Sequence, residues 1–166
     1  MIRESAPTAK DWIRHLGMER HPEGGYYSAS FAAEDFIHPK THGGSRKLYT
    51  SIYFLLEQGD VSRFHRLKSD ELWYFHAGSA LTVHRISPDG RLLSEALGLD
   101  IQSGERPQLL VPAGDIFGSE LSDDGAYALV GCMVSPGFDF ADFELFNQQE
   151  LLTKFPQHGP VIRRLT

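Results

Sequence analysis

The sequence predicts an all-β barrel with one short helix near each end of the chain. Short segments rich in Tyr, Phe, Ile and Val recur along most of the sequence, and clusters of turn-forming residues separate them. Helical periodicity is confined to two short stretches. With 166 residues, of which 41% are hydrophobic and 23% charged, the composition is that of one globular domain, which we take to span residues 1–166.

The two helices are expected near the two ends of the barrel sequence. In the first, Trp12, Ile13 and Leu16 fall on one apolar stripe, and Thr8 is a suitable N-cap. The second is expected at residues 147–154, where apolar side chains again follow a helical spacing.

Between these helices, alternating or apolar runs define the strands. The turns that separate them contain Gly, Pro, Asp and Ser, which tolerate tight backbone conformations. The hairpin turn at residues 87–90 is the clearest of these turns. The predicted strands are 25–31, 47–56, 61–67, 71–77, 80–86, 92–97, 108–111, 116–121 and 127–134.

Residues 33–45 lack apolar periodicity and are expected to form a mobile loop, a candidate lid over a pocket. His38 and His42 have the four-residue spacing of a helical metal pair. Pro39 and the two glycines after His42 disfavour a helix there, so we do not assign these histidines to a metal site.

Composition excludes several classes of partner. The net charge of −6 and the absence of a Lys/Arg-rich run argue against nucleic acid binding. No apolar run approaches the roughly 20 residues of a membrane-spanning helix, so no membrane partner is expected. The N-terminal residues resemble neither a secretory signal nor a transit peptide, which favours a cytoplasmic location. Cys132 is the only cysteine, and its apolar neighbours indicate a buried structural thiol.

The most informative stretch is residues 59–78. If the chain reverses at residues 68–69, His65 lies opposite Glu71 across a hairpin, and period-two alternation places both on one sheet face. A histidine and a carboxylate among aromatic residues are typical of a small-molecule pocket. The alternative is that His65 and Glu71 form a cross-strand pair on a solvent-exposed face of the sheet. The other residues expected on this face are Arg63, Leu67, Trp73 and Phe75.

This stretch resembles the first sequence motif of the cupin superfamily. The matched positions are Gly59, His65, Glu71 and Gly78. The second histidine of that motif is replaced here by Leu67. Residues 110–121 are similar to the second cupin motif, with Phe117 in place of its histidine and Leu121 in place of its asparagine.

Segments 21–27, 50–56, 62–66 and 135–144 resemble an uncharacterised cupin branch classed as a domain of unknown function. The resemblance covers nearly the whole chain. It implies a double-stranded β-helix, the cupin jelly-roll barrel, and a homodimer, but it supplies no reaction.

The resemblance also indicates whether the chain should bind a metal ion. Metal-binding cupins hold the ion with three histidines and a glutamate, and Leu67 and Phe117 occupy two of these positions. His65 and Glu71 alone rarely suffice, so no cofactor and no tightly bound metal are expected. A metal, if held, would use His65 and Glu71, with a third ligand from elsewhere; His76 and His84 are the candidates.

Without a metal, His65 beside Glu71 suits acid–base chemistry, with His65 as the base that removes a proton next to a carbonyl. Metal-free sugar epimerases of the cupin superfamily look similar in outline, and Tyr26, Tyr53 and Tyr127 are candidates to return the proton. We therefore expect a metal-independent isomerase or epimerase acting on a sugar-like or carboxylate metabolite. The alternatives are a non-catalytic ligand-binding cupin and a metal-dependent cupin enzyme.

Arginines near the expected pocket mouth are candidates to clamp a carboxylate or phosphate, although each alone is more typical of a surface salt bridge. Gly24 and Gly25 beside Glu23 would let the backbone approach a ligand, or else serve a turn. The candidate ligand-binding residues are Arg46, Tyr53, Arg63, Trp73, Phe75 and Phe117.

Overall fold

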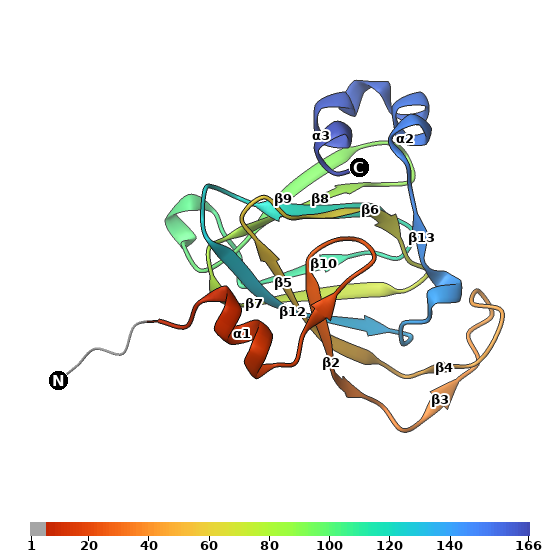
Figure 1. Cartoon of the computed structure of the whole chain (residues 1–166). Coiled ribbons are helices and arrows are strands. Elements are labelled where there is room, and N and C mark those ends of the chain that lie inside the picture. The colour runs from red at the N-terminus through yellow and green to blue at the C-terminus, as the bar shows by residue number, and fades with distance from the viewer. Residues whose placement is uncertain (1–5) are drawn as a thin grey trace.

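A computed structural model describes residues 6–166 as an antiparallel β-barrel built from two facing sheets (Figure 1). This confirms the predicted jelly-roll class. The six-stranded sheet contains, in spatial order, β1 (Glu19–Arg20), β2 (Tyr26–Ala32), β5 (Thr50–Glu57), β12 (Tyr127–Ser135), β7 (Asp70–Gly78) and β10 (Gln108–Val111). The five-stranded sheet contains β13 (Glu144–Leu145), β6 (Val61–Arg66), β11 (Ile116–Leu121), β8 (Leu81–Ile86) and β9 (Leu92–Leu97).

Shorter elements complete the chain. The ribbon of β3 (Phe36–Ile37) and β4 (Arg46–Lys47) lies beside the barrel. The α-helices are α1 (Ala9–His15), α2 (Gln148–Lys154) and α3 (Gly159–Arg164). The 3-10 helices are η1 (Ile101–Ser103), η2 (Phe140–Asp142) and η3 (Pro156–His158).

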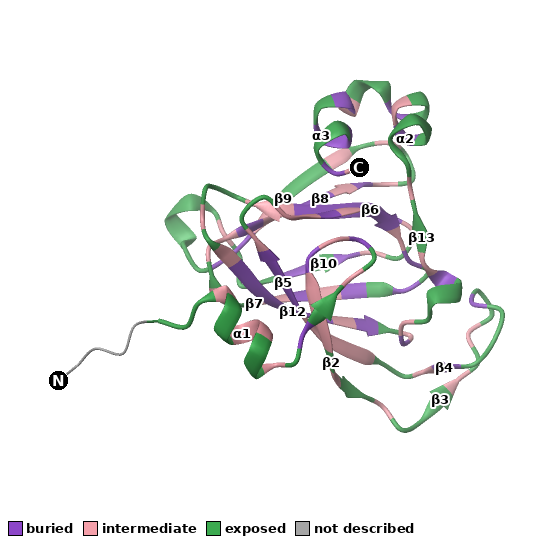
Figure 2. Cartoon of the chain, viewed as in Figure 1, coloured by how far each residue is buried: buried purple, intermediate pink, exposed green. Residues whose placement is uncertain are grey.

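The core fills the barrel interior because alternate residues of each strand point inward. Figure 2 shows the buried residues concentrated on the barrel strands β5, β6 and β12, whereas β3 and the end of β2 are largely exposed. The largest interior side chains are Phe54, Trp73 and Phe117, and each is about 1% exposed. Their rings meet edge to face, at centroid distances of 6.0 Å for Phe54 with Trp73 and 6.3 Å for Trp73 with Phe117.

Helix α1 covers the outer face of the six-stranded sheet, as its apolar stripe predicts. Trp12, Ile13 and Leu16 pack in a cluster that includes Leu55 and Leu129. The helix begins with a capping box in which Thr8 and Asp11 satisfy each other's backbone N–H groups.

The C-terminal helices cover the outer face of the five-stranded sheet. Leu151 from α2 and Ile162 from α3 pack against Phe64 and Ile116 of the strands. Helix α2 agrees with the predicted helix, whereas α3 was not predicted. Its glycine and proline read as helix breakers, but Pro160 stands in the first turn, where a missing N–H costs nothing.

The strand predictions are confirmed with shifted ends at several positions, but one predicted pairing is wrong. Strands β6 and β7 do not form a hairpin: β6 pairs with β11 and β13, and β7 pairs with β10 and β12. His65 is in register with Phe117, and Glu71 with Val134. The chain crosses between the sheets at residues 67–69 instead of reversing within one.

The predicted loop at residues 33–45 is partly structured. It contains β3, and His42 is 5% exposed, with its Nε2 2.7 Å from the Ser69 hydroxyl. Among the described residues that line the cavity introduced below, none comes from 33–45, so the candidate lid does not cover that cavity.

Within residues 6–166, none of the helices has the length and apolar character needed to cross a membrane.

Candidate functional site

A cavity of about 330 Å³ opens at one end of the barrel interior. This volume is at the lower end of the range for small-molecule sites. Its walls come from both sheets, from the loop before β2 and from the segment after β12. The apolar walls include Tyr27, Ile52, Leu67, Val134, Phe138 and Phe143. The histidine and glutamate side chains that line it are His21, Glu23, His65 and Glu71.

Two glycines allow Glu23 to enter the barrel. At Gly24, φ is +112° and a Cβ would lie 2.0 Å from the carbonyl oxygen of Val61. At Gly25, φ is +73° and a Cβ would lie 2.7 Å from the carbonyl oxygen of Leu55. Any other residue would push the loop away from β5 and β6. The tight approach leaves Glu23 6% exposed.

Arg63 fixes the same loop. Its backbone N–H donates to the Glu23 carbonyl oxygen at 2.8 Å. Its guanidinium donates to the carbonyl oxygens of Pro22 and Glu23, the latter 3.4 Å from Nε. Arg63 therefore positions Glu23 and does not line the cavity.

A bulge in β6 explains why the alternation argument misplaced Arg63. His65 is in register with Phe117, but Ser62 is in register with Ser119, so β6 carries one residue more than β11 over this interval. A bulge shifts the inward–outward alternation by one position. Arg63 consequently does not share the inward face of His65.

The His65 ring lies between two hydrogen-bond acceptors. Its Nδ1 is 2.6 Å from the Arg63 carbonyl oxygen, and its Nε2 is 2.9 Å from Oε2 of Glu23. A carbonyl oxygen and an ionised carboxylate can only accept, so both ring nitrogens donate. The geometry is satisfied by a protonated His65 paired with an ionised Glu23.

The pKa directions agree with this ion pair. Burial opposes the charge of both groups, but the charge and hydrogen bond of Glu23 outweigh it and raise the pKa of His65. In the same way, the charge and hydrogen bond of His65 overcome burial and lower the pKa of Glu23. Each group keeps the other charged in an apolar interior.

Glu71 reaches the cavity from the opposite sheet. It lies on β7, between Val111 of β10 and Val134 of β12, and is 7% exposed. Burial and the negative charge of Glu23 raise its pKa to about 7, and the charge of His65 only partly opposes them. At neutral pH this carboxyl group exists in both protonation states, as a proton carrier requires.

His21 is the fourth member of the set. Its Nδ1 accepts the Glu23 backbone N–H at 3.1 Å, so the neutral ring carries its proton on Nε2. Burial lowers the pKa of His21, and the Glu23 carboxylate, 3.8 Å from Nδ1, offsets this only in part. His21 is therefore a neutral donor in the cavity wall.

Three of the predicted ligand-binding aromatic residues pack in the core around the cavity. Trp73 and Phe117 are buried, and the Phe117 ring lies 4.1 Å from the His65 ring, centroid to centroid. Phe75 is partly buried against the same core cluster. None of the three lines the cavity, and of the three Phe117 packs directly against His65.

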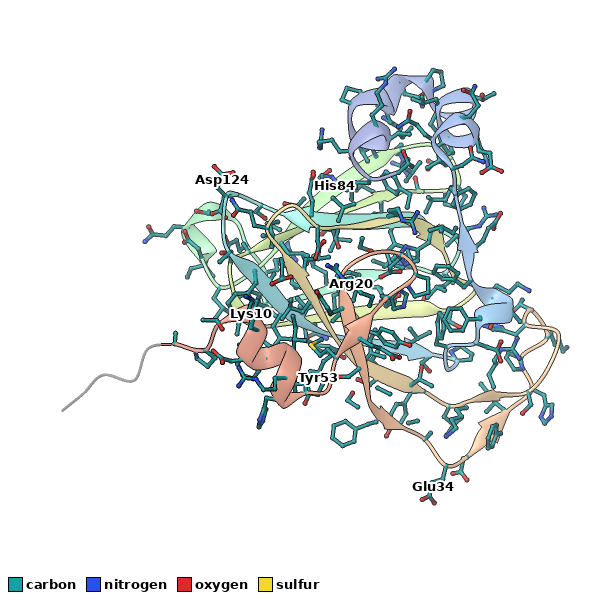
Figure 3. The ribbon with its side chains drawn as sticks, in the orientation of Figure 1. Lys10, Arg20, Glu34, Tyr53, His84 and Asp124 are labelled. Atoms are coloured by element: carbon teal, nitrogen blue, oxygen red, sulfur yellow. The ribbon has the colours of Figure 1, made fainter. Side chains whose placement is uncertain are left out.

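Arg46 and Tyr53 lie elsewhere. Arg46 is buried in an ion pair with Asp142, with Nε 2.7 Å from Oδ2, and so anchors the segment that forms one wall of the cavity mouth. Tyr53 points out of the barrel into the cluster under α1 (Figure 3). Tyr26 and Tyr127, the other candidate acids, belong to that same outer cluster.

Sequence reasoning placed His65 and Glu71 correctly inside the barrel but missed His21 and Glu23 as site residues. The available signal was the pair Gly24 and Gly25, which was read as a backbone feature. Whether Glu23 enters the barrel depends on contacts between this loop and a strand about 40 residues later in the sequence. The contacts are made by residues 61–63.

The donor set does not fit the metal site of metal-binding cupins. Leu67 and Phe117 stand where two histidines would be, and the Nε2 of His65 is engaged with Glu23. Across residues 6–166, no cluster of three or more His, Cys, Asp or Glu side chains is arranged to hold an ion. We derive no chemistry through a metal.

The antiparallel two-sheet barrel with an internal site at one end defines a cupin-type jelly roll. The chain belongs to the family described as "Cupin superfamily (DUF985)", which it matches over residues 10–146.

Two solved structures share this fold over nearly their full length, and one further protein is similar in sequence. Protein SO0799 from Shewanella oneidensis is 53% identical, with a TM-score of 0.90 over 97% of this chain and 98% of that one. A hypothetical protein from Leishmania major is 40% identical, with a TM-score of 0.91 over 96% and 99%. Uncharacterized protein YML079W from Saccharomyces cerevisiae is 28% identical in an alignment of 164 positions that covers 90% of this chain and 80% of that protein.

A more distant likeness concerns the fold alone. An oxalate decarboxylase structure is 18% identical, with a TM-score of 0.55, and the chain spans 36% of its length. The similarity supports the barrel architecture and carries no information on chemistry.

Proposed function

We propose that the protein is a metal-independent isomerase that moves a proton at a carbon beside a carbonyl group, with Glu71 as the proton carrier. The observation that carries this proposal is a buried carboxyl group in the wall of a largely apolar cavity, with a pKa raised to about 7 by burial and by Glu23. General acid–base catalysis is most efficient when the pKa of the catalytic group is near the working pH.

The proton transfer balances within the site. The Glu71 carboxylate takes the proton, the electron pair of the C–H bond forms a carbon–carbon double bond, and the carbonyl π pair moves to oxygen. The imidazolium of His65 lines the same cavity and is paired with Glu23, so its charge offsets only part of the negative charge that develops. Glu71 then returns the proton to a carbon conjugated with the enolate, and the electron pair on oxygen re-forms the carbonyl group.

The geometry favours Glu71 over His65 as the base. Both nitrogens of His65 donate to fixed acceptors, so the ring has no free lone pair. Epimerisation also requires an acid on the opposite face of the substrate, and Tyr26, Tyr53 and Tyr127 lie outside the barrel. We therefore favour double-bond isomerisation by one carrier over epimerisation.

Hydrogen–deuterium exchange at carbon tests the proposal. The protein is incubated in D2O with a panel of small ketones, and incorporation of deuterium beside the carbonyl is followed by NMR. We expect exchange with at least one ketone, and Glu71→Gln should slow it by about a hundredfold or more.

Glu34→Gln is the matched control, because Glu34 is exposed and lies near β3, away from the barrel interior (Figure 3). It should exchange at the wild-type rate. Saturable binding without exchange would contradict the isomerase and leave the alternative, a ligand-binding cupin. Exchange that survives in Glu71→Gln would contradict the role of Glu71.

A further inference from the structure

The charges around the cavity restrict what it can hold. No lysine or arginine lines it. Arg46 pairs with Asp142, Arg63 binds the Pro22 and Glu23 carbonyl oxygens, and Lys68 approaches Asp142 at 3.9 Å. An anionic ligand would meet Glu23 and Glu71 and would lack a free cation. Burial of an uncompensated charge in such a site is strongly unfavourable.

A cationic ligand is no better matched. His65 is itself positive, and Glu23 already neutralises it. The remaining carboxyl group is Glu71, which is 7% exposed, so burial opposes its ionisation. A cation would therefore approach an imidazolium, and its counter-ion would be a Glu71 carboxylate that is ionised at a desolvation cost.

Among the histidine and glutamate side chains of the cavity, those left for a ligand are one donor, His21, and one proton carrier, Glu71. Within the described chain, the Nε2–H of His21 has no protein hydrogen-bond partner, while its Nδ1 is occupied by the Glu23 N–H. A carbonyl oxygen can accept from this Nε2–H. Glu71 can then face the carbon beside that carbonyl.

The remaining walls are mainly aromatic and aliphatic, with the small polar residues Ser30, Thr50, Ser51 and Cys132 among them. Phe138, Phe140 and Phe143 pack edge to face with centroid distances of 4.9–6.2 Å, and Ile52 and Val134 lie on the facing wall. Such walls match a ring or another apolar skeleton.

We propose that this cavity selects an uncharged, largely apolar carbonyl compound, whose carbonyl oxygen accepts a hydrogen bond from His21 Nε2. The ligand class departs from the sequence-based expectation of a sugar-like or carboxylate metabolite. The inference names the substrate class of the proposed isomerase; its carbonyl part rests on that function, whereas the exclusion of charge rests on the cavity alone.

The test uses three probes of similar shape: acetophenone, benzoate and protonated benzylamine. Binding to the full chain is measured at pH 7 by titration calorimetry or ligand-observed NMR. We expect acetophenone to bind at least about tenfold more tightly than either ion. Tighter binding of benzoate or benzylamine, or no saturable binding of any probe, would overturn the proposal.

The role of His21 is tested with ethylbenzene, which has the shape of acetophenone without the oxygen. The wild type should prefer acetophenone, and His21→Phe should lose this preference while still binding ethylbenzene. His21→Gln, which keeps an N–H donor, should restore part of it. A preference for acetophenone that persists in a folded His21→Phe variant would refute the assignment.

Failure of this inference and of the isomerase are distinguishable. Acetophenone binding without carbon–deuterium exchange would refute catalysis and keep the ligand class. Exchange on a charged substrate, with no binding of acetophenone, would refute the ligand class and keep catalysis.

Discussion

Glu23 and Glu71 are buried glutamates of one cavity, yet their surroundings move their pKa values in opposite directions. Glu23 has a direct partner in His65 and its pKa is lowered, whereas Glu71 feels the negative charge of Glu23 and its pKa is raised. Two carboxyl groups with separated pKa values are the usual basis for assigning one a structural and the other a proton-carrying role.

Substitution of Glu23 should neutralise His65. In Glu23→Gln the carboxylate that outweighs burial is gone, so the pKa of His65 should fall below its ordinary range. In nitrogen-15 NMR spectra at pH 7, we expect an imidazolium in the wild type and a neutral ring protonated on Nδ1 in the variant, since the Arg63 carbonyl remains. An unchanged imidazolium signal would contradict the pairing, and Glu34→Gln serves as the control.

At the residue scale, the sequence was sufficient to identify His65 and Glu71 as interior residues, because alternation depends only on neighbours along the strand. It was insufficient for their partners. The carboxylate that pairs with His65 belongs to Glu23. Glu23 lies on a loop far from β6 in the sequence, and the two come together only in the folded chain.

At the element scale, the loop between α1 and β2 determines the site. Gly24 and Gly25 allow it to pack against the barrel strands, and Arg63 holds its carbonyl groups. Glycine at these two positions is required by positive φ values and by the carbonyl oxygens of Val61 and Leu55, which occupy the space of a side chain.

Gly24→Ala should therefore cost about 3 kcal/mol of unfolding free energy, since it combines backbone strain with overpacking. Gly59→Ala is the matched control: its φ is also positive, at +86°, but a Cβ there would have no neighbour within 4 Å, so about 1 kcal/mol is expected. Urea unfolding measures both values. Equal losses in the two variants would contradict the close approach of Gly24 to Val61.

The sequence predicted the boundaries of the strands better than it predicted which strands pair. The strands at 92–97, 108–111 and 116–121 coincide with β9, β10 and β11. The β6–β7 hairpin was wrong because a short connection in a two-sheet barrel can pass between sheets as easily as reverse within one. The bulge in β6 was likewise not encoded in any local pattern, and it displaced Arg63.

At the scale of the whole molecule, the buried site makes stability depend on pH. The pKa of Glu71 is raised from an ordinary 4.5 to about 7, so the folded state binds a proton that the unfolded state has released between these values. The contribution of Glu71 to the free energy of unfolding should therefore fall as pH rises from 4.5 to 7. His65, whose pKa is also raised, acts in the same direction at higher pH, as its stabilising proton is lost.

The comparison with Glu71→Gln isolates this effect, because glutamine does not titrate. Relative to that variant, the wild type should lose about 3 kcal/mol between pH 4.5 and 7. Chemical denaturation at a series of pH values measures the difference. Parallel stability curves for the two proteins would show that Glu71 is not perturbed.

The outer edge of the six-stranded sheet gives the prediction of a homodimer a physical basis. Strand β1 pairs only with Tyr26 and Tyr27, so residues 28–32 of β2 have no strand on that side within the described chain. Phe31, on this edge, is 70% exposed. Edges of this kind are commonly covered by another chain. Sedimentation equilibrium should give twice the chain mass, and a monomer at micromolar concentration would contradict the prediction.

The central claim is that Glu71 is a proton carrier whose pKa is raised to about 7 by burial and by the charge of Glu23. Carbon-13 NMR titration of the glutamate side-chain carboxyl groups, with Glu71 assigned by its absence in Glu71→Gln, tests it most directly. The account predicts a Glu71 midpoint of about 7. A midpoint near 4.5, the ordinary value for glutamate, would contradict it.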